Sequence, residues 1–140
     1  KERLERIVDD IMFDMMKQPR LKTERGTAML VANSIYEACK YWELFVNRGF
    51  TQCAIVTSYE PTAAAVRTAT TDLTQTSEEE YKKKIYERML GGKSVTEFEA
   101  DVKKLFKESP AKMKLLIVVD KLLTGFDAPS ATYLYIDKYA

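Results

Sequence analysis

Histidine is absent from this sequence, and cysteine occurs only as Cys39 and Cys53. Without histidine the chain cannot form the usual zinc ligand sets, a Ser-His or Cys-His nucleophile pair, or an imidazole proton shuttle. Both cysteines lie in apolar patterns, which favours small core residues in a reducing compartment over a disulfide or a nucleophile. We therefore expect a cytoplasmic protein with no metal site.

The sequence also lacks a long apolar run and an excess of either charge. No segment approaches the roughly 18 apolar residues that a membrane span requires, so no membrane contact is expected. There are 22 Lys and Arg residues against 21 Asp and Glu residues, and the formal net charge is +1. This balance gives no overall attraction for nucleic acid or an anionic membrane, so any such contact must be local.

The size and composition of the chain fit one domain with one core. It has 140 residues, of which 46% are hydrophobic. It begins with Lys1 instead of Met and stops directly after a strand pattern, with no closing turn or polar tail. We expect it to be a piece of a larger protein.

Four apolar runs predict strands, and four amphipathic segments predict helices. In the first helix, apolar residues recur at three- and four-residue spacing up to the region of Pro19. Each other helix begins with a serine followed three residues later by a glutamate, the spacing of a capping box. These pairs are Ser34 with Glu37, Ser77 with Glu80, and Ser94 with Glu97. The predicted helices span 3–17, 34–46, 78–90 and 95–108, the predicted strands span 27–33, 52–58, 113–119 and 131–137, and residues 60–76 are predicted as a short helix or ordered loop.

The order of these elements predicts an α/β fold. The strand runs are continuously apolar, which is typical of parallel strands covered on both faces. Their alternation with helices predicts right-handed crossovers and a parallel sheet between two helix layers. Ligands of such folds bind at the carboxyl ends of the strands. The candidate loops are therefore 33–34, 57–59 and 120–129, of which the last combines charge, a hydroxyl, a glycine, an aromatic residue and a proline.

The sequence "GGKS" at 91–94 has the composition of a phosphate loop without its spacing. The full pattern requires a glycine where Glu87 stands, and a strand before the loop where a charged helix is predicted. We interpret the segment as a helix break followed by a cap.

The segment "LLIVVDKLLTGFDAPSATYLYIDK" contains a strand ending in Asp120, then four residues, a Gly-aromatic-Asp sequence and Pro129. It resembles motif V of superfamily 2 helicases and, more specifically, the motor (R) subunit of type I restriction enzymes. The segment "GTAMLVANSIYEACKYWELF" resembles motif IV of that subunit. With "EEEYKKKIYERML" and "KESPAKMKLLIVVD" included, the resemblance covers nearly all of the chain, and "LLTGFDAP" is its most specific part.

This resemblance implies a three-layer RecA-like fold of the P-loop NTPase type, incomplete at its C-terminus. Residues 1–18 would be a lead-in or linker helix, and residues 19–140 would be the second RecA-like lobe of a helicase region. In a parent of this family, the phosphate loop and the Mg-binding acidic motif belong to the first lobe, and the motif VI arginines follow the present segment. ATP and Mg²⁺ are therefore expected only in the full-length parent, and the fragment alone is expected to be inactive.

The resemblance also implies roles for individual residues. Gly125 and Asp127 would face ATP, since glycine allows a tight backbone turn and a carboxylate can accept hydrogen bonds from ribose hydroxyls. Asp127 has an equally good reading as a turn-capping residue before Pro129. Phe126 is expected to fill the core rather than to stack on a base. No catalytic residue and no metal ligand is expected in this chain.

A second group of residues would contact the nucleic-acid backbone. Lys121 and Thr124 can bind phosphate oxygens, and Asp120 would orient Lys121 or a backbone amide. Ser34 matches the hydroxyl position after the motif IV strand, although its capping-box spacing with Glu37 is a sufficient structural reason for a serine. The aromatic residues of the following helix, Tyr41, Trp42 and Phe45, are expected to be core and packing residues.

The implied function is the ATP-dependent DNA-translocating motor of a type I site-specific deoxyribonuclease, in which this lobe lines the ATP cleft and the DNA path. Its partners would be duplex DNA, the first RecA-like lobe, and the modification and specificity subunits. Two alternatives are open: the second lobe of another superfamily 2 helicase, such as an excision-repair helicase, and a non-motor α/β module that binds a nucleotide or a protein.

Overall fold

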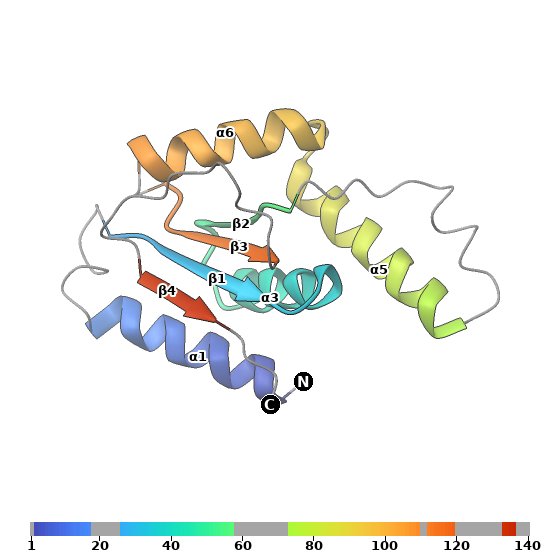
Figure 1. The fold of residues 1–140 in the computed structure, drawn as a ribbon, viewed down its shortest axis with the longest axis horizontal. Helices are drawn as coiled ribbons and strands as arrows, with labels where there is room; N and C mark the ends of the chain where they lie inside the picture. Colours follow the sequence, from blue (N-terminus) through green and yellow to red (C-terminus); the bar gives the residue numbers. More distant parts are fainter. Residues whose placement is uncertain (1, 18–25, 58–72, 110–111, 120–132, 137–140) are drawn as a thin grey trace.

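The computed structural model of the chain describes residues 2–17, 26–57, 73–109, 112–119 and 133–136 (Figure 1). Four helices and four strands lie in these ranges. In chain order they are α1 (Glu2–Lys17), β1 (Ala28–Ala32), α3 (Ile35–Asn47), β2 (Cys53–Ile55), α5 (Leu73–Leu90), α6 (Val95–Glu108), β3 (Leu115–Val119) and β4 (Tyr133–Ile136).

The four strands form one parallel sheet in the order β2-β3-β1-β4. The connection from β1 to β2 passes β3 and contains α3, whereas the return from β2 to β3 contains α6. Right-handed crossovers that run in opposite directions along a sheet place their helices on opposite faces. Accordingly, α6 lies on one face, and α1 and α3 lie on the other (Figure 1).

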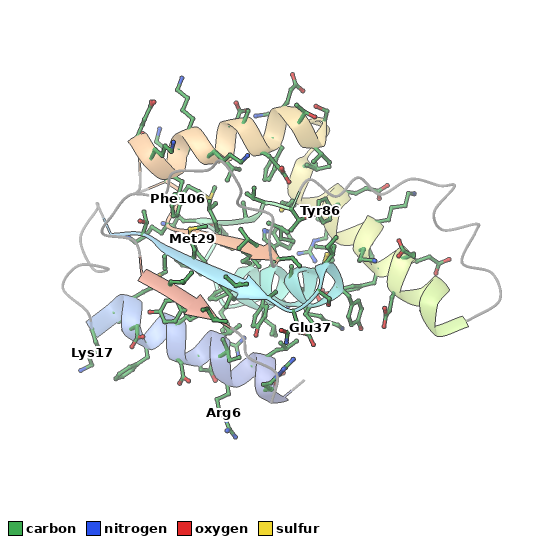
Figure 2. All side chains as sticks on the ribbon, viewed as in Figure 1. Arg6, Lys17, Met29, Glu37, Tyr86 and Phe106 are labelled. Carbon is green, nitrogen blue, oxygen red and sulfur yellow. The ribbon has the colours of Figure 1, made fainter. Side chains whose placement is uncertain are left out.

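Alternate residues of β1, β2 and β3 enter two separate cores, one on each face of the sheet. On the first face, Leu30, Ile55 and Ile117 pack in one cluster with residues of α1, α3 and α5. On the second face, Met29 and Leu116 cluster with residues of α6, and Met29 lies opposite Phe106 (Figure 2). The sequence-based prediction of continuously apolar, doubly covered parallel strands is confirmed for β1, β2 and β3. In β4, Tyr135 packs against the first core, whereas Leu134 and Ile136 on the other face are 59% and 51% exposed, so the described part of the fold does not cover that face of the edge strand.

Helix α1 packs against the body of the fold. Leu4, Val8 and Ile11 are buried in the first core. The Tyr135 hydroxyl of β4 donates a hydrogen bond of 2.9 Å to Asp14 Oδ2. The predicted helix over residues 3–17 is confirmed, while the division into a linker helix at 1–18 and a lobe at 19–140 stays a prediction.

The prediction of a helix start at Ser77 is wrong. Helix α5 begins at Leu73, so Ser77 lies one full turn inside the helix. A residue inside a helix has amides around it that already donate to backbone carbonyls, and its side chain therefore cannot serve as the N-cap. The other two predicted caps are present, since Ser34 Oγ accepts from the Glu37 amide and Ser94 Oγ accepts from the Glu97 amide, both at 3.1 Å.

The "GGKS" segment is a helix break, as predicted. Helix α5, not a strand, precedes it, and Ser94 is the N-cap of α6. Gly91 (φ 59°) and Gly92 (φ 93°) have the left-handed backbone that favours glycine at the end of a helix. Lys93 forms an exposed ion pair with Asp101 at 2.8 Å. None of the described helices is long and apolar enough to cross a membrane.

Candidate functional site at the carboxyl edge of the sheet

The carboxyl ends of the two central strands, β1 and β3, lie side by side. Their last residues, Ala32 and Val119, are register partners. The end of β1, from which the chain continues to Ser34, therefore lies beside the end of β3. Strand β2 ends next to β3, where the Val56 amide donates to the Ile117 carbonyl at 2.9 Å. Three strand ends thus meet at one edge, as the sequence predicted.

Ser34 is held in a defined conformation at this edge. Its backbone is extended (φ −154°, ψ 165°), its hydroxyl accepts from the Glu37 amide, and its carbonyl accepts from the Ala38 amide at 2.9 Å. These are the bonds of an N-cap residue. The helix-capping interpretation of Ser34 is therefore confirmed. Its proposed contact with a nucleic-acid backbone stays a prediction.

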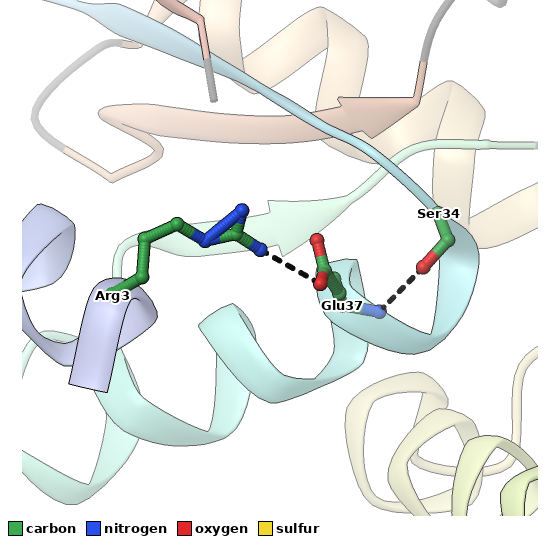
Figure 3. Close-up of polar contacts among 3 residues, drawn as sticks. All are labelled: Arg3, Ser34 and Glu37. Carbon is green, nitrogen blue, oxygen red and sulfur yellow. Dashed lines mark hydrogen bonds and ion pairs between the residues drawn. The ribbon is translucent and has the colours of Figure 1, made fainter. Parts of the chain in front are cut away.

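The predicted capping box at Ser34 is only half formed. In a complete box the Glu37 carboxylate would also accept the Ser34 amide. Instead, Glu37 Oε2 accepts a hydrogen bond of 2.8 Å from Arg3 of α1 (Figure 3). Within the part of the chain that the structure describes, Glu37 Oε1 is buried and has no hydrogen-bond partner. The charged guanidinium of Arg3 competes with the neutral Ser34 amide, because charge-assisted hydrogen bonds are the stronger kind.

A buried polar cluster anchors the end of β2. Thr57, which follows β2, donates its amide to Glu99 Oε2 of α6 at 2.9 Å. The Thr57 hydroxyl and the Tyr86 hydroxyl of α5 are 2.8 Å apart, and either can be the donor. Glu99 is only 6% exposed and Tyr86 is fully buried. This cluster joins the strand end to both helices that precede β3.

Neither Arg3 nor Glu99 was identified from the sequence, although both left a signal there. The buried positions of α6 are Val95, Glu99, Val102 and Phe106, which is the spacing of one helix face. A glutamate on an apolar stripe predicts a buried carboxylate that needs a donor. Arg3 directly precedes the buried Leu4 and is therefore at the border of the apolar face of α1.

A group of aromatic and charged side chains joins α3 to α5. The Tyr81 hydroxyl donates to Glu43 Oε1 at 2.6 Å, and Lys40 lies 4.5 Å from the centroid of the Tyr81 ring. Burial and the hydrogen bond to Glu43 raise the pKa of Tyr81. Arg88 lies over the Trp42 ring at 5.2 Å. The core interpretation of Tyr41, Trp42 and Phe45 is confirmed, since none is more than 8% exposed.

Most of the predicted site residues lie outside the described ranges. These are Asp120, Lys121, Thr124, Gly125 and Asp127, and Phe126 lies outside as well. Among the predicted site residues, only Ser34 is described. In the described part of the chain there is also no group of three or more Cys, Asp or Glu side chains that could hold a metal ion.

Residues 24–140 match the family model for domain 3 of the type I restriction enzyme subunit R. The chain belongs to this family. The match includes all four strands and α3, α5 and α6, whereas α1 lies before it. Searches of curated proteins and of solved structures found no match.

Membership of this family confirms the resemblance inferred from motifs IV and V. The parallel sheet with helices on both faces is the α/β, RecA-like architecture that the resemblance implied. The chain is thus part of a type I restriction enzyme R subunit, which favours this assignment over an excision-repair helicase or a non-motor binding module.

Proposed function

We propose that this domain is the second RecA-like lobe of the ATP-dependent DNA-translocating motor of a type I restriction enzyme. The observation that carries the proposal is the family match over residues 24–140, a range that contains the motif-V-like "LLTGFDAP" sequence. The lobe would line the ATP cleft and the DNA path in the cytoplasm. It would act together with the first lobe and with the modification and specificity subunits.

The geometry of the sheet supports this role. The chain enters the "LLTGFDAP" segment from the carboxyl end of β3, directly beside the end of β1. Carboxyl ends of parallel strands are where α/β folds bind nucleotides. The two polar segments that the sequence assigns to ligands therefore start from neighbouring strands at one edge.

In this proposal, different residues at the edge contact two different ligands, ATP and DNA. Gly125 and Asp127 face ATP, with the Asp127 carboxylate accepting hydrogen bonds from ribose hydroxyls. Ser34, Lys121 and Thr124 contact phosphates of duplex DNA, which positions the duplex without reading its sequence. ATP and Mg²⁺ supply phosphoryl-transfer chemistry, which depends on positioning and electrostatic stabilisation. Closure on the first lobe and reopening after hydrolysis would move the DNA.

The first prediction concerns Asp127 in the full-length R subunit. Asp127→Asn keeps the size of the side chain and most of its capping capacity but removes its charge. We expect it to lower DNA-dependent ATP hydrolysis and translocation while thermal stability stays close to wild type. If Asp127 only caps a turn, Asp127→Asn will leave turnover unchanged, and Asp127→Ala will mainly lower stability, by about 1 kcal/mol.

The matched control for this experiment is Asp101→Asn. Asp101 lies on the exposed side of α6 and is paired with Lys93, so the variant removes the same charge from a surface outside the proposed cleft. ATPase rate and thermal unfolding are measured for all three variants. Unchanged turnover in Asp127→Asn would remove Asp127 from the proposed ATP site.

A further inference from the structure

Helix α1 brings an arginine to the carboxyl edge of the sheet. The helix runs antiparallel to the strands, so its first turn lies at the edge where β1 ends (Figure 1). Leu4, Val8 and Ile11 fix the helix to the core. Arg3 thereby meets Glu37 in the first turn of α3, at an N–O distance of 2.8 Å (Figure 3).

Two consequences follow from this contact for the Ser34 turn. First, the Glu37 carboxylate is held away from the Ser34 amide, which it would otherwise accept as the second half of a capping box. Second, Arg3 balances the negative charge of Glu37 at the edge. A carboxylate without this partner would repel a phosphate group nearby, because like charges at close range raise the free energy of binding.

We infer that Arg3 is a positioning residue for the DNA contact, because it diverts and neutralises Glu37 and so keeps the Ser34 amide and hydroxyl available to a phosphate of duplex DNA. This inference rests on the proposed function of the edge. It gives α1, which lies before the matched family domain, a part in the binding site. The contact is partly buried, with 31% and 25% of the two side chains exposed, so solvent screens it only in part.

The test uses the full-length R subunit and a fluorescent duplex at one fixed, low salt concentration. In Arg3→Gln the Glu37 carboxylate is released and completes the capping box. We expect the Kd for duplex DNA to rise roughly twofold to tenfold, while the melting temperature stays near wild type. The double variant Arg3→Gln with Glu37→Ala removes the released carboxylate, and the Kd should return most of the way to the wild-type value.

The matched control is Arg48→Gln, which breaks an ion pair between α1 and the C-cap residue of α3. This pair joins Arg48 to Asp9 at 3.2 Å and lies at the other end of α3. If Arg3 only docks α1, Arg3→Gln and Arg48→Gln will change the Kd for duplex DNA alike, and adding Glu37→Ala will not restore the Kd. Either result overturns the inference. A wild-type subunit that binds no duplex would overturn the proposed function as well, whereas normal wild-type binding with an unaffected Arg3→Gln variant would overturn this inference alone.

Discussion

At the residue scale, the two cysteines show how burial changes side-chain chemistry. Cys39 is fully buried and Cys53 is 4% exposed, and neither forms a disulfide. Burial removes solvent from the thiolate and raises the pKa of each thiol from about 9 to about 12. Since the thiolate is the reactive form, both cysteines are expected to be inert near neutral pH. This agrees with their interpretation as small core residues.

The raised pKa values predict a loss of stability at alkaline pH. Between pH 9 and 12 the native thiols keep their protons while those of the unfolded chain release them. The stabilisation is therefore complete below pH 9 and is lost as the pH rises toward 12. The free energy of unfolding is measured with urea at several pH values for the wild type and for the Cys39→Ala, Cys53→Ala double variant. Its slope against pH should differ between the two proteins by up to about 1.4 kcal/mol per pH unit for each thiol. Apart from Tyr81, whose pKa Cys39 also raises, the remaining ionisable groups are the same in both proteins, so identical pH dependences would contradict this prediction.

At the element scale, helix α6 both covers the sheet and fixes a strand end. Its apolar residues Val102 and Phe106 fill the second core, while Glu99 on the same stripe holds the Thr57 amide. A buried carboxylate is unfavourable unless hydrogen bonds compensate for the lost hydration. The position of α6 along its axis is therefore coupled to Thr57 at the end of β2.

The next prediction tests this coupling at Glu99. Glu99→Ala leaves the buried Thr57 amide without its acceptor, and we expect a loss of about 1–3 kcal/mol in the free energy of unfolding. Glu99→Gln retains an acceptor oxygen and should cost less. The control Lys104→Ala changes an exposed residue in the middle of the same helix, away from its caps, and should stay within about 0.5 kcal/mol of wild type. Urea unfolding measures all three, and equal effects of Glu99→Ala and Lys104→Ala would rule out the anchor.

Much of the element order was predictable because periodicity and caps are local properties. Helix α6 was predicted with its observed bounds, since Ser94 provides a local start signal and the apolar stripe is regular. Helix α5 was predicted too short, because a Ser-x-x-Glu spacing occurs inside helices as well as at their ends. The strand runs were predicted in order, yet their pairing in the sequence β2-β3-β1-β4 depends on contacts between distant segments.

The candidate site was less predictable than the fold. Ser34 was identified because it follows a strand and begins a helix. Arg3 is separated from Glu37 by 34 positions, and only the packing of α1 on α3 brings the two side chains together. The same is true of Glu99 and Thr57, which are 42 positions apart. Sequence patterns indicate that a buried charge needs a partner, but the partner is chosen by tertiary structure.

At the scale of the whole molecule, the fold separates the two cores from the edge at which we propose ligand contact. Two cores on opposite faces of the sheet hold the strands, and the polar side chains of Ser34 and Thr57 lie at the carboxyl edge. Helix α1 takes part in both regions, with Leu4, Val8 and Ile11 in the core and the Arg3–Glu37 ion pair at the edge. Because the formal net charge is only +1, the DNA binding that we propose for this domain would have to depend on local contacts at that edge.

The last prediction is that residues 1–140 alone bind duplex DNA weakly and with strong sensitivity to salt. One lobe offers only a few phosphate contacts, and each contact releases about one counterion. The logarithm of the binding constant should therefore fall with the logarithm of salt concentration with a slope of about −2 to −4. Titration of two duplexes of unrelated sequence at several salt concentrations, followed by anisotropy, should give the same slope and affinity for both, because phosphate contacts carry no sequence information. Binding that survives high salt would show that contacts other than those to phosphates contribute, and a preference for one duplex would show that base edges are read. Either result would contradict a lobe that contacts only the DNA backbone.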